Sequence, residues 1–191
     1  MEYAATSPNL MASYLRILPA ESIPSQAVAT SQAFYIIRGF FYYYLCLYCL
    51  DSNHILCYLG SGTSTSEHGE IKWSDGDFFV LPATSTEVIH AATADTAIYW
   101  VTDEPLLAYL GVSPNVQKFR PTVFRREKML AEVENIKHQP GAEHRNRLGI
   151  LLGNKITEKG TLTLTHVLWS LLNQLPAHDA QVAIYFLLIY T

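Results

Sequence analysis

The sequence predicts an all-β domain, either a sandwich or a barrel of short strands. Runs of aromatic and β-branched residues recur through the first half of the chain, and strands favour this composition. Clusters of Gly, Pro, Asp, Ser and Thr separate these runs at short intervals and mark turns. Many short strands divided by turns are typical of sandwiches and barrels.

Composition allows one domain with a hydrophobic core and excludes an electrostatic nucleic-acid binder. The chain has 191 residues, of which 49% are apolar and 16% charged, with a net charge of −4. That charge gives no reason to expect a nucleic-acid partner. The short basic run Arg125, Arg126 and Lys128 is interrupted by Glu127, and we expect it to be a solvated helix face.

Targeting and cysteine patterns indicate a cytoplasmic protein without a membrane partner. The N-terminus lacks a basic region followed by an apolar one, and no apolar run reaches the length of a membrane span. The chain has three cysteines, Cys46, Cys49 and Cys57, and an odd number in a chain without a secretory signal argues against a disulfide framework. No second cysteine pair completes a zinc site, so we interpret the C-x-x-C as accidental.

The first strands follow a weakly patterned N-terminus, residues 1–13, which we expect to be flexible. We predict strands at residues 14–18 and 33–38, with a polar, turn-rich stretch at 19–30 between them. Further on, residues 61–66 form a turn or strand, and strands are predicted at 70–73 and 96–102.

One stretch, Gly76 to His90, is predicted to be a strand, a tight turn and a second strand. Residues 78–81 are apolar up to Pro82, residues 84–86 are small and polar, and the β pattern resumes at Val88. A histidine just inside the mouth of such a hairpin is a candidate metal ligand.

Helices are predicted only after Asp103. Residues 104–110 indicate a short helical turn, and residues 124–137 place Met129, Leu130, Val133 and Ile136 at helical spacing. Residues 161–175 alternate like a strand.

The spacing of Gly76, Pro82 and His90 resembles the second motif of the cupin superfamily, although Thr84 stands where a glycine is usual. In the frame of the first cupin motif, Gly39 matches the closing glycine. Gln32 then stands at the position of the glutamate, and Gln26 and Val28 stand at those of the two histidines. A cupin metal centre typically uses three histidines and a carboxylate, and His90 alone remains here. We therefore expect no cofactor in this chain and interpret His90 as a hydrogen-bonded histidine at the barrel mouth, the single weak candidate for a metal ligand.

A wider resemblance, over residues 31–176, is to bicupins similar to gentisate 1,2-dioxygenase. It is carried by SQAFYIIRG, EHGEIKWSDGDFFVLP, YWVTDEPLLAYLGV and EHRNRLGILLGN. The resemblance implies a cupin double-stranded β-helix (a jelly-roll barrel) at residues 14–103, a helical linker at 104–160, and one strand of an incomplete second barrel within 161–191. The full-length relatives are non-haem Fe(II) dioxygenases that open the ring of a dihydroxylated aromatic acid.

Two charge-poor segments depart from the family pattern, an atypical insertion at residues 40–59 and an atypical tail at 182–191. Our hypothesis is that both are translated non-coding sequence. The alternative is a genuine hairpin insertion and a genuine terminal strand.

Two functions follow from the resemblance. The first is a truncated relative of the ring-cleaving dioxygenases, inactive by itself because the first-motif ligands are replaced. The alternative is a non-catalytic cupin scaffold or small-molecule binding domain, with a small aromatic acid as ligand and Gln26, Gln32 and His90 at the mouth of its pocket. We expect the barrel interior to be lined by Phe34, Ile36, Phe78, Val80, Ile98 and Trp100 or their strand neighbours. Self-association is also expected, because single cupin sheets pair edge to edge and the predicted strand at residues 161–175 would have an unpaired edge that can bind another strand.

Overall fold

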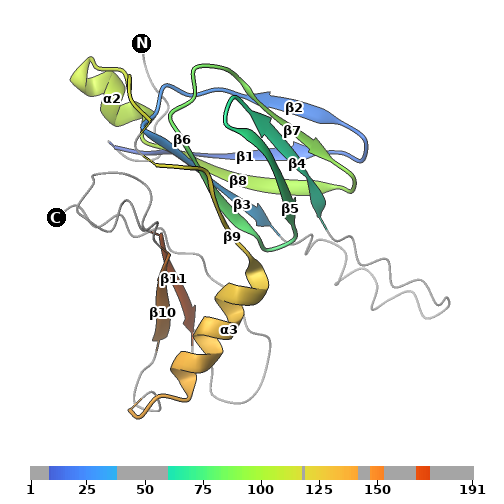
Figure 1. Cartoon of the computed structure of the whole chain (residues 1–191), viewed down its shortest axis with the longest axis vertical. Coiled ribbons are helices and arrows are strands. Elements are labelled where there is room, and N and C mark those ends of the chain that lie inside the picture. The colour runs from blue at the N-terminus through green and yellow to red at the C-terminus, as the bar shows by residue number, and fades with distance from the viewer. Residues whose placement is uncertain (1–8, 38–59, 118, 142–146, 153–166, 173–191) are drawn as a thin grey trace.

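Two antiparallel sheets face each other and form the body of the domain (Figure 1). The computed structural model describes residues 9–37, 60–117, 119–141, 147–152 and 167–172. The first sheet has the strand order β1-β8-β3-β6-β9, and the second has the order β2-β7-β4-β5. The prediction of an all-β domain is therefore confirmed, and the chain crosses repeatedly between the two sheets, with β4–β5 and β8–β9 as the consecutive strands that share a sheet.

The five-stranded sheet comprises β1 (Met11–Ile17), β8 (Thr96–Thr102), β3 (Ser31–Ile37), β6 (Phe78–Pro82) and β9 (Thr122–Phe124). The four-stranded sheet comprises β2 (Ser22–Ser25), β7 (Val88–Ala92), β4 (Ser61–Ser66) and β5 (Gly69–Ser74). Helices α2 (Glu104–Leu110) and α3 (Arg126–Lys137) lie outside the sheets, and β10 (Arg147–Leu152) pairs with β11 (Val167–Leu172) beside α3 (Figure 1).

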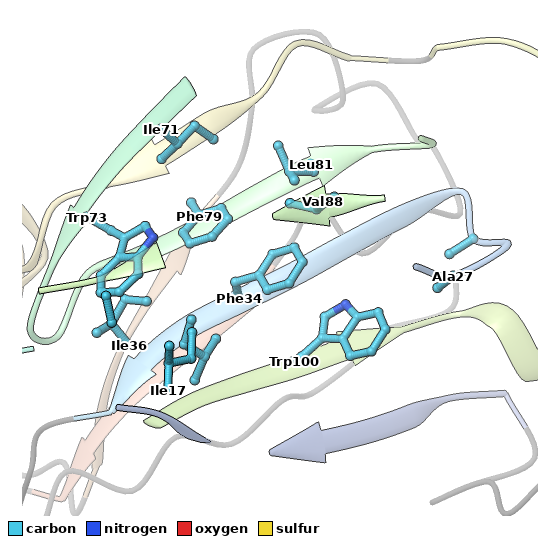
Figure 2. Packing of buried hydrophobic residues seen from close by; sticks show 13 residues of the cluster. Ile17, Ala27, Phe34, Ile36, Ile71, Trp73, Phe79, Leu81, Val88 and Trp100 are labelled. Carbon is cyan, nitrogen blue, oxygen red and sulfur yellow. The ribbon is translucent and has the colours of Figure 1, made fainter. Parts of the chain in front are cut away.

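An aromatic core fills the space between the two sheets. The ring of Phe34 stacks on Phe79, with centroids 4.8 Å apart, and lies parallel to Trp100 at 6.1 Å (Figure 2). Of the interior residues expected from the sequence, Phe34, Ile36, Ile98 and Trp100 belong to this core. Phe78 and Val80 do not, because β6 presents their neighbours Phe79 and Leu81 to the interior.

The outer face of the five-stranded sheet is covered by a second apolar cluster. Phe78, Val80 and Tyr35 pack there with Met129 and Val133 of α3. Because β6 is buried on both faces, its sequence is a continuous apolar run without alternation, and the run does not indicate which residues point inward.

Four local predictions need correction. The first strand begins at Met11, three residues earlier than expected. The stretch predicted to be rich in turns contains the edge strand β2. Pro24 is tolerated in this strand because its missing N–H faces no partner strand. The strands on either side of residues 83–87 do not form a hairpin, since β6 and β7 lie in different sheets. Phe124 belongs to β9, so α3 begins at Arg126.

Predictions for the end of the chain are tested only in part. β11 lies within the predicted strand 161–175 and pairs antiparallel with β10. The segments 40–59 and 182–191 lie outside the described residues. Within the part of the chain that the structure describes, none of the helices has the length and hydropathy needed to span a membrane.

Candidate functional site

His90 is completely buried in the four-stranded sheet, where β7 runs between β2 and β4. Its Nε2 atom lies 2.8 Å from the Ser25 hydroxyl, and its Nδ1 atom lies 2.7 Å from the Ser64 hydroxyl. Ser64 is the residue directly opposite His90 in the β4–β7 register. Each ring nitrogen is therefore held by a serine from a neighbouring strand.

The contact between Trp73 and Ser64 bears on which groups donate and which accept in the hydrogen bonds of His90. The indole N–H of Trp73 donates to the Ser64 hydroxyl oxygen at 2.8 Å. We assign the arrangement in which the Ser64 O–H also finds an acceptor among the described residues: the Ser64 O–H donates to Nδ1, and the His90 Nε2–H donates to the Ser25 oxygen. His90 is thus the neutral Nε2–H tautomer, and burial lowers its pKa to about 4, so it stays uncharged at neutral pH. We call this chain of Trp73, Ser64, His90 and Ser25 the histidine network.

Gln32 is also fully buried, and both ends of its amide are engaged. Its Oε1 atom accepts the indole N–H of Trp100 at 3.2 Å, and its Nε2 atom donates to the Thr84 hydroxyl at 2.8 Å. Gln32 is therefore bonded directly to the Trp100 indole, and His90 is linked to the Trp73 indole through Ser64. Both side chains thus have the hydrogen-bond partners that buried polar groups need.

Gln26 is not at a barrel mouth with these two residues. Its side chain is exposed, and so is that of Val28. The residues that alternate with them, Ser25, Ala27 and Ala29, are buried instead. The side chain that reaches His90 from this segment is therefore that of Ser25, and Gln26 at the mouth of a pocket stays a prediction.

The residues around His90 do not fit an iron ion. Non-haem iron is held by imidazole and carboxylate groups with open positions beside them. The polar neighbours of His90 are uncharged serine hydroxyls, and both of its ring nitrogens already have partners. In the described ranges, no three His, Cys, Asp or Glu residues are grouped so that they could hold a metal ion.

A charged cluster joins the barrel to α3. The buried Asp77 carboxylate pairs with Arg125 at 2.6 Å, and Asp75 lies 3.6 Å from Arg126. These residues line a surface pocket of about 440 Å³ together with Glu127. Arg125 and Arg126 are thus barrel contacts, which corrects the prediction of a purely solvated basic face.

Comparisons with known proteins identify the fold. No protein-family model matches the chain, and a search of curated proteins finds no match either. Among solved structures, salicylate 1,2-dioxygenase from Pseudaminobacter salicylatoxidans matches with a TM-score of 0.59 and 16% identity over 90% of this chain and 54% of that chain. The cupin 2 conserved barrel domain protein from Leptotrichia buccalis matches with a TM-score of 0.46 and 13% identity, covering 87% and 52% of the two chains.

The similarity covers only part of the dioxygenase chain. This chain spans about half of the length of the dioxygenase in its longer match, and about a quarter in a shorter match to the same enzyme with gentisate (25% of that chain at a TM-score of 0.41). At 16% identity the similarity establishes the fold and leaves activity open. The chain has the all-β cupin fold, which it shares with salicylate 1,2-dioxygenase.

Proposed function

We propose that this barrel is a non-catalytic cupin domain, the scaffold half of a two-barrel protein related to iron-dependent ring-cleaving oxygenases, and that it is inactive by itself. The observation that carries the proposal is the histidine network, in which Ser25 and Ser64 occupy both ring nitrogens of His90. A catalytic iron would need one of these nitrogens, together with several further ligands and open positions for substrate and O₂.

The interior also lacks a partner for an aromatic acid. Among the described residues, the polar groups bonded to one another around His90 and Gln32 are the neutral imidazole, serine and threonine hydroxyls, the Gln32 amide and two indole N–H groups, none of which is a cation. A carboxylate placed among them would be desolvated without a cation. We therefore assign the small aromatic acid to the relatives, one of which was solved with gentisate, and place no such ligand in this barrel.

Metal analysis after anaerobic incubation with Fe(II) tests the proposal, together with an assay of gentisate and salicylate cleavage. The unmodified chain is compared with His90→Ala and with His138→Ala, a matched control in which an exposed histidine at the end of α3 is removed. We expect iron far below one ion per chain in all three proteins, and no cleavage. Near-stoichiometric iron that is lost in His90→Ala and kept in His138→Ala would overturn the proposal.

The alternative, a small-molecule pocket at Gln26, Gln32 and His90, has less support. Gln26 is exposed, and the interior side chains of Gln32 and His90 are bonded to protein groups. Self-association remains part of the proposal, since β1 is an edge strand of the five-stranded sheet. Light scattering after size-exclusion chromatography measures it, and a strictly monomeric chain would remove it.

A further inference from the structure

The loop that joins β6 to β7, residues 83–87, crosses from one sheet to the other. β6 belongs to the five-stranded sheet and β7 to the four-stranded sheet, so this crossover loop connects the two sheets. His90 lies on β7 shortly after the loop ends. The crossover loop is therefore the segment that leads directly into the strand that carries His90.

The crossover loop is tied to the five-stranded sheet from inside the barrel. The Gln32 amide of β3 donates to the Thr84 hydroxyl at 2.8 Å and is itself held by Trp100. Gln32 and Thr84 stand at two positions where this chain departs from the cupin motifs, and the two replacements contact each other. A glycine at position 84 offers no side-chain acceptor, so this tie exists only because of the threonine.

A second set of ties holds the loop to the four-stranded sheet. The β4–β5 turn carries Glu67, whose carboxylate accepts the backbone N–H of Ser85 at 3.0 Å and also the Ser85 hydroxyl. In the same turn, His68 Nε2–H donates to the Ala83 carbonyl at 2.9 Å. The hydrogen bonds of Ser85 hold the pKa of the Glu67 carboxyl below its ordinary value, so it is ionised as an acceptor at neutral pH.

We propose that the crossover loop is a strap that closes the barrel over His90, locked from inside by Gln32–Thr84 and from outside by Glu67–Ser85. The two locks anchor the loop to opposite sheets, so releasing either one lets this end of the barrel open without separating the sheets themselves. This inference deepens the proposed function, because a locked strap explains how the polar interior stays closed to water and ligands.

Carbethoxylation of His90 by diethyl pyrocarbonate measures this opening, with the exposed His138 as internal reference. Thr84→Val keeps the side-chain shape and removes the acceptor, whereas Thr84→Ser keeps the hydroxyl. Losing one buried hydrogen bond corresponds to a rise of about tenfold in the open population, so Thr84→Val is expected to raise the His90 labelling rate by about that factor. Thr84→Ser is expected to label at the rate of the unmodified chain.

Ser85→Ala provides a second variant at an exposed position, where folding is not at risk. It is expected to raise His90 labelling in the same direction, and thermal unfolding confirms that each variant is folded. The strap is overturned if Thr84→Val and Ser85→Ala both label His90 at the unmodified rate, or if Thr84→Ser labels as fast as Thr84→Val. The readout is access to His90 and involves no metal, so this outcome is independent of the iron analysis.

Discussion

Asp77 caps helix α3 from the barrel: its Oδ1 atom accepts the backbone N–H of Arg126, the first residue of the helix, at 3.0 Å. Its Oδ2 atom accepts the backbone N–H of Ser74 at 3.0 Å and the Arg125 guanidinium at 2.6 Å. Helix α3 has no side-chain cap of its own at Arg125, so this carboxylate satisfies a donor that the helix leaves open. One buried side chain thus joins the barrel to the linker.

Removing the cap is expected to destabilise the fold more than removing the ion pair. Asp77→Ala leaves two backbone N–H groups without their acceptor and is expected to lower the free energy of unfolding by about 2–3 kcal/mol. Arg125→Ala is expected to lower it by about 1 kcal/mol, because the arginine is half exposed and the backbone bonds remain. Urea unfolding of both variants measures the difference, and equal losses would assign the effect to the ion pair instead.

Two features favour glycine at position 76: its left-handed backbone conformation and the close approach of the Arg126 side chain of α3. Its φ is +77°, and a Cβ at this position would lie 2.5 Å from Arg126 Cδ. Gly141 is a matched control, with φ of +83° and no atom within 4 Å of a built Cβ. We expect Gly141→Ala to cost about 1 kcal/mol from the left-handed backbone alone, and Gly76→Ala to cost measurably more.

A double variant separates the two causes at Gly76. Adding Arg126→Ala removes the side chain that the new Cβ meets, so the excess cost of Gly76→Ala is expected to shrink in that background. The unfolding free energies of the four proteins form a double-mutant cycle. An unchanged excess would show that the contact with Arg126 does not matter.

The two serines of the histidine network are expected to differ in importance. Ser64→Ala leaves both the Trp73 indole N–H and the His90 Nδ1 atom without their partner, whereas Ser25→Ala affects only His90 Nε2. Because an unsatisfied buried group costs about 1–3 kcal/mol, we expect Ser64→Ala to destabilise the protein about twice as much as Ser25→Ala. Chemical denaturation compares them, and a larger loss for Ser25→Ala would contradict this hydrogen-bond arrangement.

Stability is expected to fall on mild acidification because His90 is buried as a neutral group. The unfolded chain binds a proton below its ordinary pKa of 6.5, and the folded chain binds it only below about 4. Stability is therefore lost as the pH falls through this window, by about 3 kcal/mol in total from this residue, with no further loss below it.

His90→Gln provides the reference for this pH dependence because glutamine does not titrate. Other groups contribute equally to both proteins, including Asp103, whose pKa is raised by burial and which acts with the opposite sign. The difference between the two curves of unfolding free energy from pH 7.5 to 4.5 isolates His90. Parallel curves would mean that His90 binds its proton with the same pKa in the folded and the unfolded chain, as a solvent-accessible histidine does.

Much of the fold was predictable from sequence because local composition marks it. Strand β8 and helix α2 have the predicted bounds, since β-branched alternation and a Gly-terminated helical turn are local signals. β2 was missed because Pro24 reads as a strand breaker, and the position of β2 at a sheet edge is a tertiary property. The sequence pattern of strand, polar turn and strand fits a hairpin as well as a crossover, so it could not show that residues 83–87 cross between the two sheets.

The site was predictable only in part for a similar reason. His90 was predicted to be a hydrogen-bonded histidine at the barrel mouth and Gln32 to lie at the mouth of the pocket, but their hydrogen-bond partners were not predicted. Ser64 lies in a run of Ser, Thr and Gly that predicts turn as readily as strand, and nothing local distinguishes it from its neighbours. Asp77 and Arg126 are 49 residues apart, so their contact follows from packing alone.

The central claim is that His90 is a closed, neutral hydrogen-bonded residue rather than a metal ligand. Its ¹⁵N ring chemical shifts, measured in the full chain at pH 7 with and without one equivalent of Zn²⁺, test this most directly. We expect the neutral tautomer with the proton on Nε2 and no change on adding zinc. A charged ring without metal, or a zinc-dependent shift at either nitrogen, would contradict it.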